Sequence, residues 1–393
     1  MISQIWGLGG QALGWNGSPL KAPMEIPFII TGGSNIVPTY TYDLGSSWLS
    51  VDVSGFGTPL TAAYGWTGQY KHVWSFNGIN MFFTSYNSTQ SKSRVWYSNN
   101  GGKTMSYFDL TDAATYNARQ FGTWTVDNSK AYITGWTNMA KVNYSTDNFL
   151  NVYESSTGQG NGNYPLILSG SKDGKYLYGG AGNSGGVICS STYGTGFTLK
   201  TLVGGGSHTQ APMCDDTGQY AMVTGNAAMG LYMTFDYGSN WSAIDASNPI
   251  SVMFYDATMM MYVTRNASPT NYFHFSTNQG GSWSTLALPS GVTNVAVPLI
   301  DNKNKVVYLY QSNVSPATLW KLNDAKNGWT NAGTFANSIG CVGVSEIGRG
   351  VCLVDWLGHV WFSPSPSNTT SWTDIGTLAN VPYDGMLKFI NVI

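Results

Sequence analysis

Short stretches of alternating apolar and polar residues recur along the chain, and none shows the 3.6-residue period of an amphipathic helix. One recurring stretch, c, alternates aromatic and polar side chains, as at 95–97, 231–233 and 272–275. The stretch before it, b, ends in small or amide residues, and a more apolar stretch, a, comes before that, joined by turns such as KDGK and DDTG. With the segment d that follows stretch c, the pattern predicts an all-β protein built from repeats of four short strands.

An eight-residue turn motif follows strand c. The clearest copies are TYDLGSSW at 41–48, TFDYGSNW at 234–241 and STNQGGSW at 276–283. Each has a hydroxyl residue, an Asp or Asn two positions on, a Gly two further, and a Trp three after that. Weaker copies lie at 98–105, around Asp147, at 190–197, and in segments ending at Trp329 and Trp372.

The motif recurs in step along the chain. Its closing residues are Trp48, Met105, Phe149, Phe197, Trp241, Trp283, Trp329 and Trp372, separated by 42–57 residues. A spacing of about 40–50 residues is what one four-stranded propeller blade needs. The chain is therefore predicted to be a β-propeller with eight blades, or with seven if one weak copy is false.

Turn chemistry explains the motif. A carboxylate or amide side chain can accept hydrogen bonds from nearby backbone N–H groups, and the following Gly can adopt a positive φ. The closing Trp can pack back between strands. A structural role is therefore expected for all these positions: Asp43, Trp48, Asn100, Asp147, Asp236, Trp241, Asn278, Trp283, Trp329 and Trp372.

These octapeptides resemble the Asp-box (BNR) repeat of the sialidase-like propeller superfamily, whose pattern is Ser/Thr-x-Asp-x-Gly-x-Thr-Trp. The resemblance covers residues 41–372. It implies a propeller fold and is nearly silent about activity, since sialidases, other glycosidases, sorting receptors and many surface proteins share the repeat.

The repeats predict one propeller domain over residues 21–393, closed by pairing of the C-terminal segment MLKFINVI with N-terminal strands of the first blade. Residues 1–20 are glycine-rich and outside the repeat. They are predicted to form an arm that docks on a partner, as in a subunit of an assembly.

Charged residues make up 10% of the chain, against a usual ~25%, while 42% of residues are hydrophobic and 14% aromatic. Such a chain can bury a core, which argues against disorder. No window reaches ~18 consecutive apolar residues, so no membrane span is expected. The N-terminus lacks the pattern of a secretory signal. Net charge is −2 with four arginines, so nucleic acid is not an expected partner.

Ligand residues are expected on one face. The a–b and c–d turns of a four-stranded antiparallel blade share one end, and the b–c and d–a loops share the other, where propeller ligands usually bind. Asn recurs in the b–c loops, which suits either turn formation or binding of sugar hydroxyls. The candidate ligand-binding residues are Trp66, Asn87, Trp136, Asn138, Glu154, Asn226, Arg265, Asn313, Asp355 and Trp356.

An enzymatic function finds little support in the sequence. A sialidase holds its substrate carboxylate with three arginines, and here Arg94, Arg119 and Arg265 have no motif around them. Other glycosidases need two carboxylates roughly 5–10 Å apart, whereas Asp355 and Glu154 lie on different predicted blades. The four histidines are scattered without zinc-ligand spacing, so no metal or cofactor is expected.

Two main classes of function and a third possibility remain open. The favoured prediction is a non-enzymatic binding or structural propeller of an extracellular or virion surface assembly, a virion appendage or adhesin that contacts glycans or a host receptor. The alternatives are a glycosidase or lyase acting on a polysaccharide, and a protein–protein scaffold.

Cys341 and Cys352 flank a predicted hairpin, which allows a disulfide, although two buried thiols are the preferred interpretation.

Overall fold

The structure is a computed structural model of the chain. It describes residues 24–30, 39–40, 49–50, 73–75, 81–87, 92–99, 104–110, 120–124, 130–135, 141–147, 149–156, 165–181, 185–202, 209–225, 230–245, 249–256, 259–264, 272–292, 296–301, 304–311, 314–344, 350–364, 371–378 and 386–392. All regular structure in these segments is β. No helix in them is long and apolar enough to cross a membrane.

Seven four-stranded sheets account for most of the strands. The first contains β4 (Val73–Ser75), β5 (Met81–Asn87), β6 (Lys92–Ser98) and β7 (Ser106–Leu110). The second contains β8 (Gln120–Trp124), β9 (Ala131–Gly135), β10 (Lys141–Ser145) and β11 (Tyr153–Ser156). The third contains β12 (Pro165–Gly170), β13 (Leu177–Ala181), β14 (Gly186–Ser190) and β15 (Thr198–Thr201). The fourth contains β16 (Thr209–Cys214), β17 (Ala221–Gly225), β18 (Leu231–Thr234) and β19 (Ser242–Asp245).

The remaining three have the same organisation. The fifth contains β20 (Pro249–Asp256), β21 (Met259–Thr264), β22 (Tyr272–Ser276) and β23 (Ser284–Ala287). The sixth contains β24 (Ala296–Asp301), β25 (Val306–Gln311), β26 (Ala317–Leu322) and β27 (Trp329–Phe335). The seventh contains β28 (Ile339–Val344), β29 (Val351–Asp355), β30 (His359–Ser363) and β31 (Thr373–Thr377).

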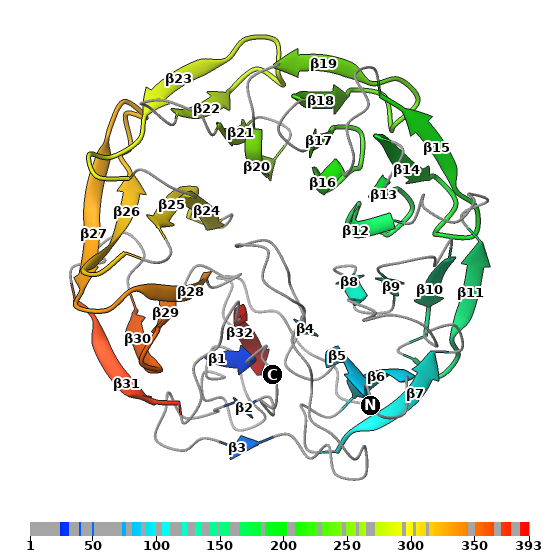
Figure 1. Ribbon diagram of the computed structural model, residues 1–393, viewed down its shortest axis with the longest axis horizontal. Helices are drawn as coiled ribbons and strands as arrows, with labels where there is room; N and C mark the ends of the chain where they lie inside the picture. Colours follow the sequence, from blue (N-terminus) through cyan, green and yellow to red (C-terminus); the bar gives the residue numbers. More distant parts are fainter. Residues whose placement is uncertain are drawn as a thin grey trace, which may run out of the picture.

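Within each sheet the strands are antiparallel and follow chain order from the centre of a ring to its rim, so they correspond to the predicted strands a, b, c and d (Figure 1). Consecutive sheets lie side by side around the ring. The protein is therefore an all-β propeller, which confirms the predicted fold class. Each sheet is a blade.

The ring closes through both ends of the chain. β1 (Met24–Ile30) pairs antiparallel with β32 (Met386–Val392), which confirms the predicted role of the C-terminal segment. The short strands β2 (Thr39–Tyr40) and β3 (Leu49–Ser50) pair with each other. Figure 1 places these four strands between the β28–β31 and β4–β7 sheets. The count of eight blades stays a prediction, because these strands form two separate pairs in the described residues.

The core lies between neighbouring blades. One cluster joins Tyr308 and Leu319 of the β24–β27 sheet to Val351 and Leu353 of the β28–β31 sheet, and all four side chains are fully buried. Successive buried residues along strand b produce this arrangement, because neighbouring side chains on a strand point to opposite faces and each blade buries both faces. Tyr308 thus packs toward the β28–β31 blade, whereas Leu309 packs toward Phe273 of the β20–β23 blade.

A repeated hydrogen-bond pattern holds the c–d turns. The Thr234 hydroxyl donates to Asp236 Oδ1 at 2.8 Å and accepts from the Gly238 backbone N–H at 3.0 Å. Asp236 in turn accepts from the backbone N–H and the side-chain amide of Asn240, at 2.9 and 2.7 Å. Gly238 has φ 79°, and a Cβ there would lie 2.9 Å from the Tyr178 ring of the preceding blade. Only glycine combines this backbone with this approach easily.

Two other turns repeat this pattern. Asp147 accepts from the Asn151 backbone N–H and side-chain amide at 2.9 and 2.7 Å. Asn278 accepts from the Ser282 backbone N–H at 2.9 Å and donates to its hydroxyl at 3.0 Å. The expected turn role of these side chains therefore matches the hydrogen bonds that each one makes.

Phe149 was expected to close its motif, and that expectation is wrong. It occupies the position that Gly238 holds in the later copy, with φ 66°. Its buried side chain packs against Tyr97 and Phe108 of the preceding blade, with ring centroids at 5.2 and 5.9 Å. Burial of the ring offsets the cost of a positive φ in a residue with a Cβ.

The closing tryptophans pack at blade interfaces in two ways. The Trp329 indole N–H donates to the Ala287 carbonyl at 3.1 Å, and that of Trp372 donates to the Ala332 carbonyl at 2.8 Å, each on strand d of the preceding blade. The indole nitrogens of Trp241 and Trp283 are buried without a hydrogen-bond partner in the described residues. Trp241 instead meets the Tyr178 ring edge-on, with centroids 6.0 Å apart.

The two cysteines of the predicted hairpin do not sit opposite each other. Cys341 pairs with Val354, and Cys352 pairs with Gly343. Cys352 is fully buried and packs with Val354 and Val360. The preferred interpretation of Cys352 as a small packed hydrophobe therefore fits the structure.

Candidate functional site

Strand order places the loops at two ends of each blade. Since all neighbouring strands are antiparallel, the a–b and c–d turns share one end and the b–c and d–a loops share the other. The b–c end was expected to hold the ligand. The b–c loop between β29 and β30, residues 356–358, follows Asp355 and lies wholly within the described residues.

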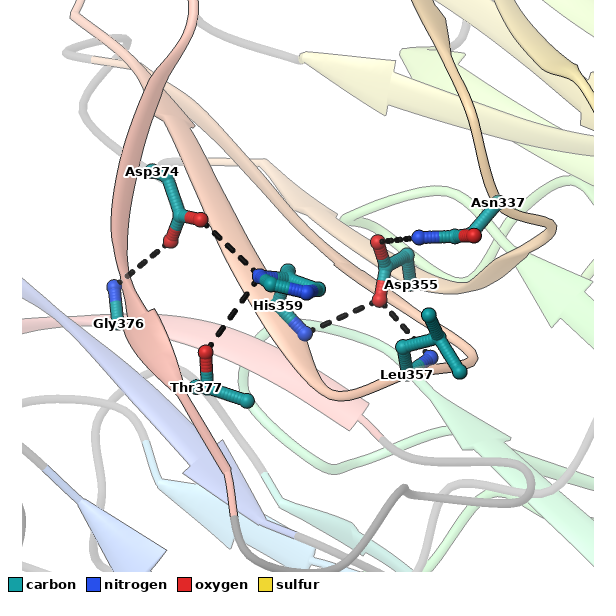
Figure 2. A network of polar contacts seen from close by, with 7 residues as sticks. All are labelled: Asn337, Asp355, Leu357, His359, Asp374, Gly376 and Thr377. Carbon is teal, nitrogen blue, oxygen red and sulfur yellow. Dashed lines mark hydrogen bonds and ion pairs between the residues drawn. The ribbon is translucent and has the colours of Figure 1, made fainter.

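Asp355 ends strand b of the β28–β31 blade and organises this loop. Its Oδ1 accepts from the backbone N–H groups of Leu357 and His359 at 2.9 and 3.0 Å. Its Oδ2 accepts from the Asn337 side-chain amide at 2.8 Å, as Figure 2 shows. The carboxylate belongs to a residue that is only 1% exposed. Both oxygens are therefore engaged in holding the loop.

Trp356 and Leu357 form the tip of this loop. The Trp356 backbone N–H donates to the Ser338 carbonyl at 2.9 Å, which ties the tip to the segment before strand a. The Trp356 side chain is half-buried, while Leu357 is 62% exposed. A half-buried Trp356 and an exposed Leu357 thus lie in a turn held by hydrogen bonds, where apolar surface can contact a ligand.

A histidine–aspartate pair lies next to this loop (Figure 2). His359 Nδ1 is 3.0 Å from Asp374 Oδ2 on strand d, and the Thr377 hydroxyl is 3.4 Å from the same ring nitrogen. The Gly376 backbone N–H holds the other Asp374 oxygen at 3.0 Å. An imidazole oriented by a carboxylate can exchange protons with a ligand. The pair sits on strands c and d, in the outer half of the ring (Figure 1).

Glu154 was expected in a loop at the ligand end, and the structure places it within β11, the outermost strand of its blade. There it pairs with Lys141 of strand c, with Nζ 2.8 Å from Oε1. Strand d is the exposed edge strand of the blade, and charged side chains are usual on such strands. Glu154 therefore fits within this strand, although its polar surroundings in the sequence suggested a loop.

Arg94 is 7% exposed and engaged within its own blade. Its guanidinium donates to both Asp109 oxygens at 2.6 and 3.1 Å. It also lies over the Tyr107 ring at 3.5 Å. Its contacts with the Asp109 carboxylate and the Tyr107 ring, both on β7, therefore join strands c and d of this blade.

Several expected positions lie outside the described residues. In the ligand set these are Trp66, Trp136, Asn138, Asn226, Arg265 and Asn313, and in the turn motif they are Asp43, Trp48 and Asn100. Asn87 is the last residue of β5, at the b–c end of its blade as expected, and its side chain is not described. Within the described segments no group of three or more His, Cys, Asp or Glu residues could hold a metal ion.

Sequence reasoning missed the pairing of His359 with Asp374. Residue order alone could not reveal it, because the two residues become neighbours only through the register between strands c and d. It also missed a row of contacts at the opposite end of the blades. The available sign was a large side chain directly before strand b in three successive repeats: Lys130, Tyr176 and Tyr220.

Comparison with known proteins shows the fold alone. No protein-family model matches the chain, and no curated protein matches its sequence. The oligogalacturonate lyase of Vibrio parahaemolyticus matches with TM-score 0.51 and 10% identity, over 73% of this chain and 86% of the lyase. A chain of the mitotic checkpoint complex matches with TM-score 0.52 and 13% identity, over 78% and 96%. The tricorn protease matches with TM-score 0.53 and 9% identity, over 90% of this chain and 38% of the protease.

These neighbours include a lyase and a chain of the mitotic checkpoint complex, so the propeller class does not by itself select a function. The protein is a β-propeller whose sequence lies far from the proteins it resembles in structure.

Proposed function

We propose that this propeller is a non-enzymatic binding module of the Asp-box type, a component of an extracellular or virion surface assembly that contacts glycans. The observation that carries the proposal is the burial and hydrogen bonding of the Asp355 side chain. This carboxylate is buried and takes three hydrogen bonds that build its loop, so it serves the structure of the loop.

The other candidate acid leads to the same conclusion. Glu154 is on the outermost strand of another blade and pairs with Lys141. Glycoside hydrolysis needs one acid and one base or nucleophile on either side of the scissile bond, about 5–10 Å apart. Asp355 and Glu154 do not form such a pair, because they belong to blades separated around the ring (Figure 1).

Ligand contact at the b–c end is assigned to aromatic and amide side chains. Trp356 and Leu357 supply apolar surface, and Trp66, Trp136, Asn138, Asn226 and Asn313 are proposed to supply more of the same chemistry on other blades. Amides and aromatic rings suit uncharged sugars, because the amides pair with hydroxyl groups and the rings pack on C–H faces.

The test combines a glycan array with an assay for released reducing sugar. Binding without turnover is expected, and Trp356→Ala should weaken it, while the Leu150→Ala control should not, because Leu150 lies in a c–d turn at the opposite end of its blade and is 78% exposed. Release of reducing sugar that is abolished by Asp355→Ala or Glu154→Ala would establish the glycosidase alternative. An absence of both binding and turnover across the array would contradict the glycan part of the proposal.

A further inference from the structure

The a–b and c–d turns of neighbouring blades form a continuous surface at the end opposite Asp355. Within the β12–β15 blade the Tyr193 N–H donates to the Lys175 carbonyl at 3.2 Å, and within the β16–β19 blade Tyr237 N–H donates to the Gln219 carbonyl at the same distance. Between these blades the Lys172 N–H donates to the Asp216 carbonyl at 2.8 Å. The turns are therefore tied both within and between blades.

One side-chain contact repeats across three blade boundaries on this surface. The residue directly before strand b contacts the fourth residue of the next blade's c–d turn. Lys130 lies 5.6 Å from the Tyr193 ring centroid, the rings of Tyr176 and Tyr237 are 4.6 Å apart, and the Tyr220 hydroxyl donates to Gln279 Oε1 at 2.8 Å.

Aromatic rings stay exposed on this surface. Tyr193, Phe235 and Tyr237 are 40%, 38% and 41% exposed. Tyr193 and Tyr237 have φ of 55° and 60°, a backbone region that aromatic residues seldom adopt, whereas Gln279 holds the equivalent place in the next turn with φ 59°. The fold does not need an aromatic ring at this position. We call Tyr176, Tyr193, Tyr220, Phe235 and Tyr237 the aromatic patch.

The charges of the described residues around the patch balance. Four lysines (130, 172, 175 and 200) and four aspartates (173, 215, 216 and 236) contribute equal and opposite formal charge in this part of the surface. Asp173 accepts from Ser171 and from the Lys175 N–H, Asp215 accepts from Thr217 and the Tyr220 N–H, and Asp236 is held by its own turn. These three carboxylates are engaged in turns. The surface thus offers ring faces and hydrogen-bonding groups without net charge.

We propose that the aromatic patch is a second glycan-binding surface and that its ligand is an extended, uncharged polysaccharide. The C–H face of a sugar ring packs on an aromatic ring, and its hydroxyls need polar partners such as Gln219, Gln279 and the lysine ammonium groups. Rings fixed by hydrogen-bonded turns lose little freedom on binding, which favours affinity from a flat surface. The inference rests on the glycan-binding function proposed above and adds a surface at the opposite end.

Affinity electrophoresis tests it, with native gels containing hydroxyethyl cellulose, starch or galactomannan, and polygalacturonate as a charged comparator. The folded full-length protein should be retarded by at least one uncharged polymer. The double variant Tyr193→Gln/Tyr237→Gln, which introduces the side chain that Gln279 has at the equivalent place, should bind about tenfold more weakly. Tyr153→Gln is the matched control, because Tyr153 is 47% exposed on the outer strand β11.

Each result of the electrophoresis supports or overturns the proposed binding at the aromatic patch. Retardation equal in wild type and double variant would overturn this surface and leave the proposed function intact. Retardation by polygalacturonate alone would overturn the uncharged ligand class, and free migration in every gel, as expected for a protein ligand, would overturn the inference. In that last case, binding on the glycan array would show that only this surface had failed, whereas release of reducing sugar would contradict the proposed function itself. Unchanged thermal midpoints of the variants confirm that they fold.

Discussion

Tyr176, at the end of an a–b turn, packs against Tyr237 in the c–d turn of the next blade, with ring centroids 4.6 Å apart and the rings tilted by 30°. The contact joins two blades near the surface, and Tyr176 also packs against the buried cluster that contains Tyr178 and Val223. The equivalent places one blade earlier and one blade later hold a lysine–tyrosine and a tyrosine–glutamine contact. Geometry is kept at this boundary while the chemistry of the pair varies.

Removal of one ring should weaken the contact between the two blades. Tyr176→Ala is expected to lower the free energy of unfolding by about 1 kcal/mol, the usual value of an aromatic pair. Urea denaturation measures it. Leu150→Ala, at a side chain 78% exposed, should stay within about 0.5 kcal/mol of wild type. Equal stability of both variants would show that the Tyr176–Tyr237 contact contributes nothing.

The c–d turn should tolerate an amide and reject an alanine at the acidic position. Asp236→Ala removes the acceptor of the Thr234 hydroxyl and of both Asn240 donors, so a loss of about 1–2 kcal/mol is expected. Asp236→Asn should cost less, because Asn278 fills the same place in the next blade. Chemical denaturation of both variants checks the order, and a reversed order would contradict the turn's assigned hydrogen bonds.

Stability should fall at acid pH through the turn carboxylates. Hydrogen bonds from the Asn151 backbone and side chain lower the pKa of Asp147 below 3.8. For Asp236, burial opposes ionisation, but hydrogen bonds from Asn240 and Thr234 outweigh it and lower the pKa. Since the folded pKa values lie below the unfolded ones, this stability is present above pH 3.8 and is lost as the pH falls through the folded values.

Thermal midpoints measured from pH 6 to pH 2.5 test this dependence. The double variant Asp147→Asn/Asp236→Asn should show a shallower decline than wild type below pH 4, because neither amide titrates. Asp216→Asn serves as a control at an exposed carboxylate outside these two turns. Parallel curves for wild type and the double variant would mean that these two turns do not contribute to acid sensitivity.

Asp355 should behave as a structural residue. Asp355→Ala leaves the Leu357 and His359 N–H groups and the Asn337 amide without their acceptor, which should cost about 2–4 kcal/mol. Asp374→Ala, at an exposed partner of His359, should cost less than about 1 kcal/mol. Differential scanning fluorimetry and denaturant titration compare them. A stable Asp355→Ala protein would reopen the assignment of this carboxylate to ligand chemistry.

Gly333 makes room for a closing tryptophan of the next blade. A Cβ on Gly333 would lie against Trp372 Nε1, whose hydrogen bond to the Ala332 carbonyl spans the boundary. Gly333→Ala should therefore cost about 1–3 kcal/mol through overpacking. Gly196→Ala is the control, since a Cβ there meets its nearest neighbour at an ordinary 3.5 Å. Similar denaturation midpoints for the two variants would contradict the close approach.

Part of the candidate site was accessible from sequence. The b–c loop with Asp355 and Trp356 was placed correctly by counting strands, because antiparallel order decides which loops share an end. The role of Asp355 was not accessible, since its partner Asn337 lies 18 residues earlier in the chain and meets it only in the folded blade. The position of Glu154 was missed because strand d is short and polar, with no alternation to mark its bounds.

Local patterns by themselves determined the all-β class, the four-strand repeat and the hydroxyl–carboxylate turns. All of these depend on hydrogen bonds and periodicity within a few dozen residues. Only the tertiary structure decided which indole nitrogens find a carbonyl, why Phe149 occupies a glycine position, and which turn residues meet across blade boundaries. Those contacts join residues about 40 to 60 positions apart, and packing between neighbouring sheets selects them.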